Sequence, residues 1–151
     1  MAVLKKYHKQ LNTIEKGAEN EAYRIIAQNQ KEIIELNTKG QLLLGKGVKG
    51  QKLIPKYSRV RYARAKNRLN PLAGIGTPDL KLTGKFYDEF FLSAKNRQLE
   101  FSSSAEYTKY LVKKYGVSQD IFGLTKENSN ILNDEILLPK LAEWLLKNIK
   151  I

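Results

Sequence analysis

The fold that this chain predicts is decided by residues 80–124, LKLTGKFYDEFFLSAKNRQLEFSSSAEYTKYLVKKYGVSQDIFGL. An aromatic run over residues 86–91 is followed by the polar turn signal Lys95-Asn96-Arg97. Leu99 and Phe101 then alternate with polar residues, as in a half-buried strand. Two such runs around a short polar break predict a β-hairpin. The aromatic run also contains (i, i+4) pairs, so part of it is alternatively one helical turn.

A short helix is expected after the hairpin. Ser103 and Glu106 have the spacing of a capping box, which predicts a helix over residues 105–115. Gly116 is a natural left-handed stop for that helix. One face of the helix carries two tyrosines, a leucine and the stem of a lysine: Tyr107, Tyr110, Leu111 and Lys114.

The chain is expected to end in a second amphipathic helix. Thr125 is its predicted cap, and the helix begins near Lys126. Pro139 cannot donate a backbone bond to Glu135, so the helix is expected to kink or restart there. Trp144 lies on the flank of the apolar stripe, either at the edge of the core or as a subunit anchor. The stripe itself consists of Ile131, Leu132, Ile136, Leu141, Leu145 and Ile149.

Residues 3–36 predict one long amphipathic helix or two in sequence, because apolar residues recur at helical spacing. Gly17 costs about 1 kcal/mol in a helix interior relative to alanine, and a break there would leave residues 1–18 as a mobile N-terminal arm. The apolar stripe is expected to pack on the inner face of the hairpin. Its heptad spacing is alternatively that of a subunit contact.

Positive charge is concentrated in one segment. The net charge is +12, and ten of the 27 Lys and Arg residues lie between Lys39 and Arg68, where no acidic residue occurs. Glycines and prolines interrupt residues 39–79, which therefore predict a basic loop insertion with short strands over residues 41–44 and 51–54 and a helical turn or two between Tyr57 and Leu69. Long basic loops of this kind are usually functional.

The basic segment has three interpretations: a solvated surface, a dock for acidic neighbours, or a nucleic-acid contact with Tyr57 and Tyr62 between the arginines. Its candidate contact residues are Lys46, Lys49, Lys52, Lys56, Arg59, Arg61, Arg64, Lys66 and Arg68. The candidate subunit-interface residues are Tyr57, Tyr62 and Trp144.

No catalytic or cofactor site is predicted. Residues 45–50 match G-x-G-x-x-G, but neither the helix nor the acidic residue of a dinucleotide site follows them. His8 is the only histidine and the chain has no cysteine, which argues against a zinc site. We expect no cofactor, no metal and no enzymatic activity.

Length and composition predict one α+β domain over residues 1–151, a small antiparallel sheet packed against long N- and C-terminal amphipathic helices. No apolar run approaches the roughly 20 residues of a membrane span. The absence of cysteine is compatible with a reducing compartment.

The order of these features resembles the tail-completion, or head–tail joining, proteins of tailed bacteriophages. The resemblance covers roughly residues 20–149 and depends on Leu82-Thr83-Gly84 before the sheet and on Ile121-Phe122-Gly123-Leu124-Thr125 before the last helix. It implies a structural virion protein, a ring-forming neck subunit that bridges the portal complex and the tail.

The expected partners are therefore other neck, portal and tail proteins, further copies of this chain in a ring, and packaged DNA. The expected location is the head–tail junction of a virion assembled in the host cytoplasm. The alternative is a small basic nucleic-acid-binding protein, either DNA-packaging or ribosome-associated.

Overall fold

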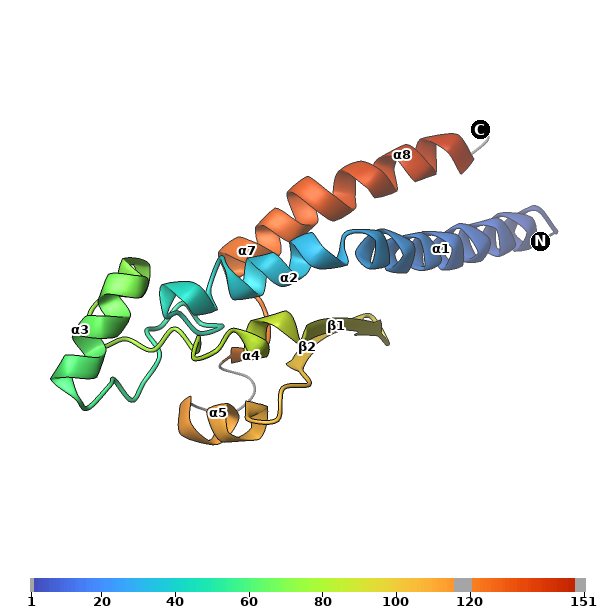
Figure 1. Ribbon diagram of the computed structural model, residues 1–151. Coiled ribbons are helices and arrows are strands. Elements are labelled where there is room, and N and C mark those ends of the chain that lie inside the picture. The colour runs from blue at the N-terminus through green and yellow to red at the C-terminus, as the bar shows by residue number, and fades with distance from the viewer. Residues whose placement is uncertain (1, 116–120, 149–151) are drawn as a thin grey trace. The chain divides into compact units, whose positions relative to one another are not determined.

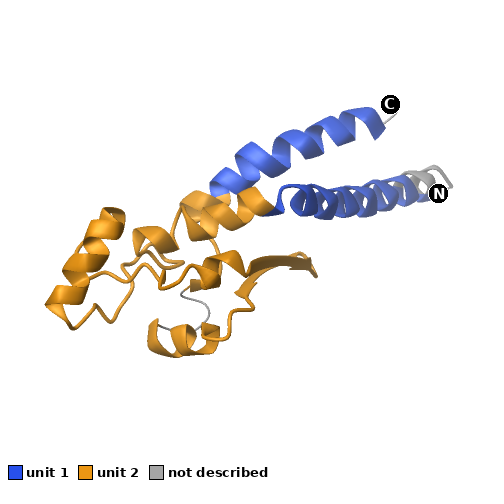
Figure 2. Ribbon diagram, viewed as in Figure 1, with its two compact units in different colours: residues 1–30, 130–151 blue, residues 31–129 orange. Residues whose placement is uncertain are grey.

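The computed structural model of the protein describes residues 2–115 and 121–148. The chain forms two compact units, unit 1 over residues 1–30 and 130–151 and unit 2 over residues 31–129 (Figure 2). Helices and one two-stranded antiparallel hairpin make up the fold (Figure 1), so the predicted α+β class is confirmed. The single domain expected from chain length stays a prediction.

Unit 1 is built on two long helices in contact. Helix α1 spans Ala2–Gln28 and α8 spans Leu138–Asn148 (Figure 1). The buried side chains of this unit come from both partners, Ile25 from α1 and Ile136 from the turn before α8. The structure therefore describes a contact between the N-terminal apolar stripe and the C-terminal helix. The expected packing of that stripe on the hairpin stays a prediction.

Helix α1 runs through Gly17 without interruption, so the helix break considered at this glycine does not occur. The glycine lies against the ring of Trp144, and a Cβ at position 17 would stand 2.8 Å from the Cη2 atom of that ring. The residue therefore serves a close approach between α1 and α8, which offsets its poor helix propensity. The mobility of residues 1–18 stays a prediction.

The helix break lies at Asn29 instead. Helix α1 ends at Gln28 and α2 spans Gln30–Thr38, which confirms the alternative of two helices in sequence. The side-chain amide of Asn29 donates to the carbonyl of Ile25 at 2.7 Å, and its backbone N–H donates to the same oxygen at 3.0 Å. Asparagine competes in this way with regular helical bonding.

The C-terminal helix begins where it is expected. The hydroxyl of Thr125 accepts from the backbone N–H of Asn128 at 3.2 Å, which is N-cap geometry, and α7 spans Lys126–Ile131. A π-helical turn, η3, spans Leu132–Leu137 before α8 begins at Leu138. Since α-helical bonding resumes one residue before Pro139, the predicted restart is confirmed.

The hairpin of unit 2 follows a single helical turn. Helix α4 spans Lys85–Asp88, strand β1 spans Phe90–Lys95 and β2 spans Gln98–Ser103, so the alternative of a helical turn within the aromatic run is confirmed. The loop is shorter than expected, since Lys95 pairs with Gln98 and only Asn96 and Arg97 connect the strands. Both have positive φ, 52° and 60°, as a type I′ turn requires.

Aromatic rings fill the space beneath the hairpin. Phe86 is completely buried, and its ring centroid lies 5.6 Å from that of Phe90 and 6.0 Å from that of Phe122. Phe90 in turn lies 6.4 Å from Phe101 on the other strand. Rings at these separations contribute about 0.5–1.5 kcal/mol per pair beyond the area they bury.

Helix α5 spans Thr108–Tyr115 and starts three residues later than predicted. The expected capping box fails because Ser103 is still the last residue of β2. Its hydroxyl donates to the carbonyl of Phe86 at 2.8 Å and accepts from the N–H of Ala105 at 3.3 Å, so it joins the strand to α4 instead. The described part of α5 ends at Tyr115, and the predicted stop at Gly116 lies outside the described residues.

The predicted strands over residues 41–44 and 51–54 are wrong. A 3-10 helix, η1, spans Leu42–Leu44, and Gly45 closes it at φ 67°, with its N–H on the carbonyl of Leu42. Within the described residues of this segment, the β-structure is a single antiparallel bridge between Lys46 and Lys52, which flanks the tight turn of residues 47–50. The first α-helix after the G-x-G-x-x-G match begins at Val60.

The rest of the basic segment is folded into unit 2. Helix α3 spans Val60–Leu69, where helical turns are expected, and a 3-10 helix, η2, spans Pro71–Ala73. Leu53 and Ala63 are buried. The segment expected as a loop insertion therefore contributes to the core of its unit.

The candidate functional site: a basic tyrosine groove

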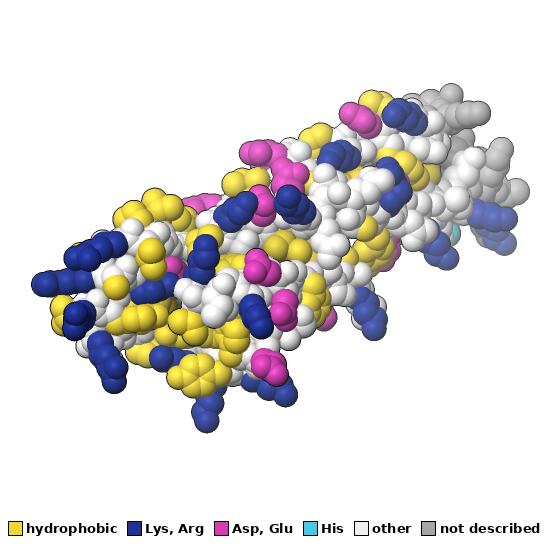
Figure 3. Space-filling view, viewed as in Figure 1, with side chains coloured by type: hydrophobic (Ala, Val, Ile, Leu, Met, Phe, Trp, Pro, Cys, Tyr) yellow, Lys and Arg dark blue, Asp and Glu magenta, His cyan; other side chains and the backbone are white. Residues whose placement is uncertain are grey.

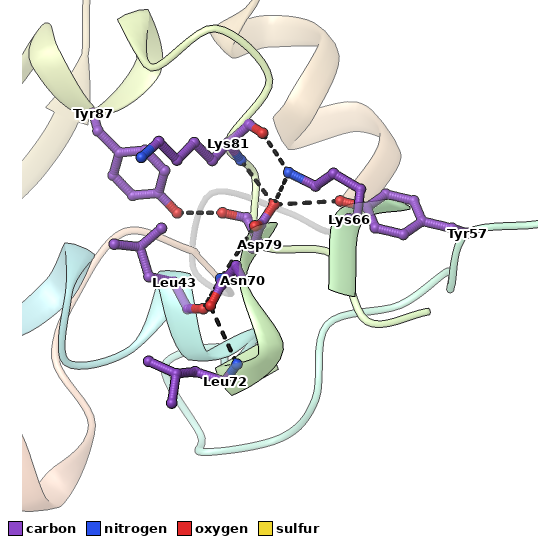
Figure 4. A network of polar contacts seen from close by, with 8 residues as sticks. All are labelled: Leu43, Tyr57, Lys66, Asn70, Leu72, Asp79, Lys81 and Tyr87. Atoms are coloured by element: carbon purple, nitrogen blue, oxygen red, sulfur yellow. Dashed lines mark hydrogen bonds and ion pairs between the residues drawn. The ribbon is translucent and has the colours of Figure 1, made fainter. Parts of the chain in front are cut away.

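A buried carboxylate holds α3 in place (Figure 4). The side chain of Asp79 is 3% exposed and forms an ion pair with Lys66 of α3 at 2.6 Å. It also accepts from the backbone N–H of Lys81 at 3.1 Å, from the amide of Asn70 at 3.1 Å and from the hydroxyl of Tyr57 at 3.4 Å. Four donors thus satisfy the buried charge, which would otherwise be costly.

The backbone of the same residue is also bonded. The hydroxyl of Tyr87 donates to the carbonyl of Asp79, which joins α4 to the network. Burial raises the pKa of Tyr87 well above its ordinary value, and the Asp79 charge adds to the shift. Burial and the same carboxylate raise the pKa of Tyr57. Both tyrosines therefore stay neutral donors at neutral pH.

Beside this network lies a groove with a cavity volume of about 460 Å³, which we call the tyrosine groove. Its walls come from three segments of unit 2, residues 55–62, residues 80–82 and the region of α5. The lining residues are Pro55, Lys56, Tyr57, Ser58, Arg59, Tyr62, Leu80, Lys81, Leu82, Tyr107, Tyr110, Leu111, Lys114 and Tyr115.

Leu80 reaches the groove through an unusual backbone conformation. Its φ is 52°, in the left-handed region that branched aliphatic residues rarely adopt. The Asp79 carboxylate captures the N–H of Lys81 immediately after it, and this bond holds the turn. Strained backbone of this kind persists only where its surroundings fix it, and it is common at binding sites.

The tyrosines are held by specific contacts. The rings of Tyr57 and Tyr62 meet edge to face at a centroid distance of 4.9 Å. The hydroxyl of Tyr107 accepts from the N–H of Phe86 at 2.8 Å, so that ring is anchored to α4. The ammonium of Lys114 lies 5.3 Å from the centroid of the Tyr115 ring.

The groove is electropositive. Among the described residues, four cationic side chains and no Asp or Glu line it: the cations are Lys56, Arg59, Lys81 and Lys114. Interaction with the Tyr115 hydroxyl raises the pKa of Lys114, so its charge is retained at neutral pH. A site of this composition attracts an anionic partner.

A second basic surface lies on the outer side of α3. Arg61, Arg64 and Arg68 have (i, i+3, i+7) spacing, which places them on one face, and all three are exposed. Large apolar side chains are exposed nearby in sequence, among them Leu69 at 82% and Leu72 at 70%. Figure 3 shows Lys and Arg side chains among hydrophobic ones over this part of unit 2.

The structure separates the nine predicted contact residues into groups. Lys56 and Arg59 line the groove together with the predicted interface residues Tyr57 and Tyr62. Exposed on α3 are Arg61, Arg64 and Arg68, and Lys49 is exposed in the turn before Gly50, whereas Lys46 is half-buried in the bridge.

Two predicted contact lysines are engaged within the fold. Lys66 is only 12% exposed and pairs with Asp79. The ammonium of Lys52 donates to the carbonyls of Leu44 at 3.1 Å and Ala73 at 2.9 Å. Trp144, the remaining predicted interface residue, is half-buried against Gly17 in unit 1.

Sequence reasoning missed the second wall of the groove, which consists of Lys81, Tyr107, Tyr110, Lys114 and Tyr115. The signal was present, since the spacing of residues 107–114 already placed them on one helix face. The sequence did not show which segment that face would meet, and Tyr110 on it is 61% exposed.

Among residues 2–115 and 121–148, no three acidic or histidine side chains gather as a metal site requires. Nor does any helix of these residues combine the length and apolarity of a membrane span. His8 is exposed on α1. In comparisons with known proteins, no family model, curated protein or solved structure matches this chain.

Proposed function

We propose that this protein is a non-enzymatic structural subunit of the neck of a tailed bacteriophage, which forms a ring between the portal complex and the tail. The observation that carries the proposal is the order of its motifs. A Leu-Thr-Gly step at residues 82–84 precedes the hairpin, and the turn at residues 121–125 precedes the last helix. Helix α5 stands between them.

The positions of both motifs in the fold support the proposal. Gly84 has φ 96° and lies immediately before α4, where a side chain would be strained. Gly123 has φ 142°, and its carbonyl accepts from the buried amides of Gln41 at 3.0 Å and of Asn37. Both glycines therefore stand at turns that connect elements of unit 2.

The surface also supports an assembly role. Large apolar side chains are exposed beside cations, including Ile75 at 67% and Leu82 at 73%. Mixed surfaces that combine apolar side chains with arginine are typical of protein interfaces. Contacts of this kind, repeated around an axis between unlike faces, close a ring.

Cryo-electron microscopy of the parent particle tests the proposal. We expect density for several copies of this chain in a closed ring at the head–tail junction. Particles assembled without the chain should contain packaged DNA but no stably attached tail. A purified particle in which the chain is absent from the neck would contradict the proposal.

A second candidate function is nucleic-acid binding, which the exposed arginines of α3 support. Three phosphates neutralised by Arg61, Arg64 and Arg68 contribute roughly 2.7 to the slope of log K against log salt, because each phosphate contributes about 0.9. A variant with glutamine at these three positions should lose that part of the slope on duplex DNA. The matched control replaces three exposed lysines of α1, which are Lys5, Lys9 and Lys16. Equal losses in both variants would indicate only nonspecific attraction to a basic protein.

A further inference from the structure

The lining of the tyrosine groove combines an apolar interior with cations. Leu80 and Leu111 line it and are buried, and Leu82 lines it and is 73% exposed. The tyrosine rings add further apolar surface. A cavity of about 460 Å³ lies within the range of sites that enclose a small ligand or a few side chains.

The charge of the groove is not neutralised within the described chain. None of its four cations forms an ion pair with a described residue. The nearest buried carboxylate, Asp79, is already paired with Lys66 and accepts three further hydrogen bonds. A partner that carries negative charge would therefore complement these cations.

The geometry of the rings favours a peptide over a nucleic acid. Bases stack on open aromatic faces. Of the five tyrosines of the groove, Tyr110 is largely exposed at 61%, whereas Tyr115 is 8% exposed and the rings of Tyr57 and Tyr62 meet edge to face at an interplanar angle of 85°. One largely exposed ring does not form a platform on which successive bases stack. The three leucines that line the cavity suit a leucine or aromatic side chain better than a nucleotide.

We propose that the tyrosine groove binds an acidic segment of a partner protein. One leucine or aromatic side chain of the segment fills the cavity, and flanking Asp or Glu residues meet the four cations. The inference depends on the proposed assembly role, in which a neighbouring neck, portal or tail protein supplies such a segment. Charged pairs at the rim set the specificity and association rate, and the buried anchor provides most of the affinity.

The test starts from a displayed library of random peptides selected on the intact protein. We expect enrichment of peptides that carry several carboxylates around one leucine or aromatic residue. Affinities of a selected peptide, labelled for fluorescence anisotropy, are then compared between two variants of α5. Lys114→Glu, which reverses a charge in the groove, should weaken binding by roughly tenfold or more. Lys113→Glu changes the same charge on an exposed neighbour outside the groove and should change binding by less than about twofold.

The anchor is tested separately with Leu82→Gln, which alters an exposed side chain and should leave the fold intact. The substitution should weaken binding of the selected peptide and should leave binding of a single-stranded oligo(dT) probe unchanged. Failure to enrich acidic peptides, or equal effects of Lys113→Glu and Lys114→Glu, would overturn the proposal. Tight oligo(dT) binding that depends on Lys114 would assign the groove to nucleic acid instead.

The outcomes separate the groove from the function of the whole chain. A chain found in the neck whose groove selects no acidic peptide would refute the groove inference alone. A groove that selects such peptides in a chain absent from the neck would refute the neck assignment alone.

Discussion

Different kinds of contact stabilise the interior of each of the two units. Unit 1 is a pair of long helices whose contact depends on apolar periodicity and on one close approach, between Gly17 and Trp144. None of the side chains of α8 is fully buried. Unit 2 consists of short elements joined by irregular segments, and buried polar side chains connect residues that are far apart in sequence. Regular helices satisfy their own backbone groups, whereas irregular segments require partners from elsewhere.

Gln41 is an example of such a connection in unit 2. Its side chain is fully buried and accepts from the N–H of Thr125 at 2.7 Å and from the amide of Asn128 at 3.0 Å. It also donates to the carbonyl of Gly123 at 3.0 Å. Gln41 thus links the end of α2 to the start of α7, and its substitution should destabilise both helix ends.

The largest effect is expected at the Asp79 network. Asp79→Ala leaves the ammonium of Lys66 poorly exposed and without its carboxylate, which should cost about 3–5 kcal/mol of unfolding free energy. Denaturant unfolding followed by far-UV circular dichroism measures the loss. In the double variant with Lys66→Met the unpaired charge is gone, so part of the stability should return. A cost below about 1 kcal/mol for Asp79→Ala would show that the network does not hold unit 2 together.

Next in size is Gln41→Ala. It leaves the backbone N–H of Thr125 and the side chain of Asn128 without their shared acceptor, at about 1–3 kcal/mol for each buried group. We expect a net loss of about 2–3 kcal/mol. Gln51→Ala, at an exposed glutamine of the same unit, is the control and should change stability by less than about 0.5 kcal/mol. Equal effects of the two variants would contradict a structural role for Gln41.

The contrast between the units also explains what could be predicted from the sequence. Periodicity predicted the long helices, the hairpin, the Thr125 cap and the restart near Pro139, since each depends on neighbouring residues. It failed at Gly17, because the glycine is needed by Trp144 and not by its own helix. It failed again at Ser103, where a bond to Phe86 replaced a helix cap.

The candidate site was predicted only in part for the same reason. Local charge density identified Lys56 and Arg59, and their neighbouring tyrosines, but could not reveal that Lys66 is neutralised by Asp79. That pairing joins residues on separate segments, and part of the groove lining is contributed by α5. Helical spacing places residues 107–114 on one face, but no local pattern encodes which segment that face meets.

A smaller effect is expected in unit 1. Gly17→Ala gains helix propensity of about 1 kcal/mol, but its methyl group would meet the Trp144 ring at 2.8 Å. In the natural background we therefore expect a loss of about 1 kcal/mol or more from overpacking. In the background of Trp144→Ala the same change should stabilise by about 1 kcal/mol. The sign reversal, measured by thermal unfolding with circular dichroism, tests the contact, and stabilisation in both backgrounds would disprove it.

The smallest effect should appear only at alkaline pH and distinguishes the buried tyrosines of unit 2. The pKa of Tyr87 is raised well above 10, chiefly by burial. From about pH 10 up to this higher pKa, the Tyr87 hydroxyl is therefore deprotonated in the unfolded chain but still protonated in the folded chain. Stability is thus fully present below pH 10 and falls above it, by at most about 1.4 kcal/mol per pH unit for each such tyrosine. Tyr87→Phe removes its contribution, so the variant should be less stable at pH 7 but should lose less stability between pH 10 and 11. Tyr110→Phe, at a largely exposed ring, should keep the slope of the natural chain. If the slope of Tyr87→Phe also matched the natural chain, the Tyr87 hydroxyl would have to be accessible to solvent, and the bond that it makes to Asp79 could not help to fix unit 2.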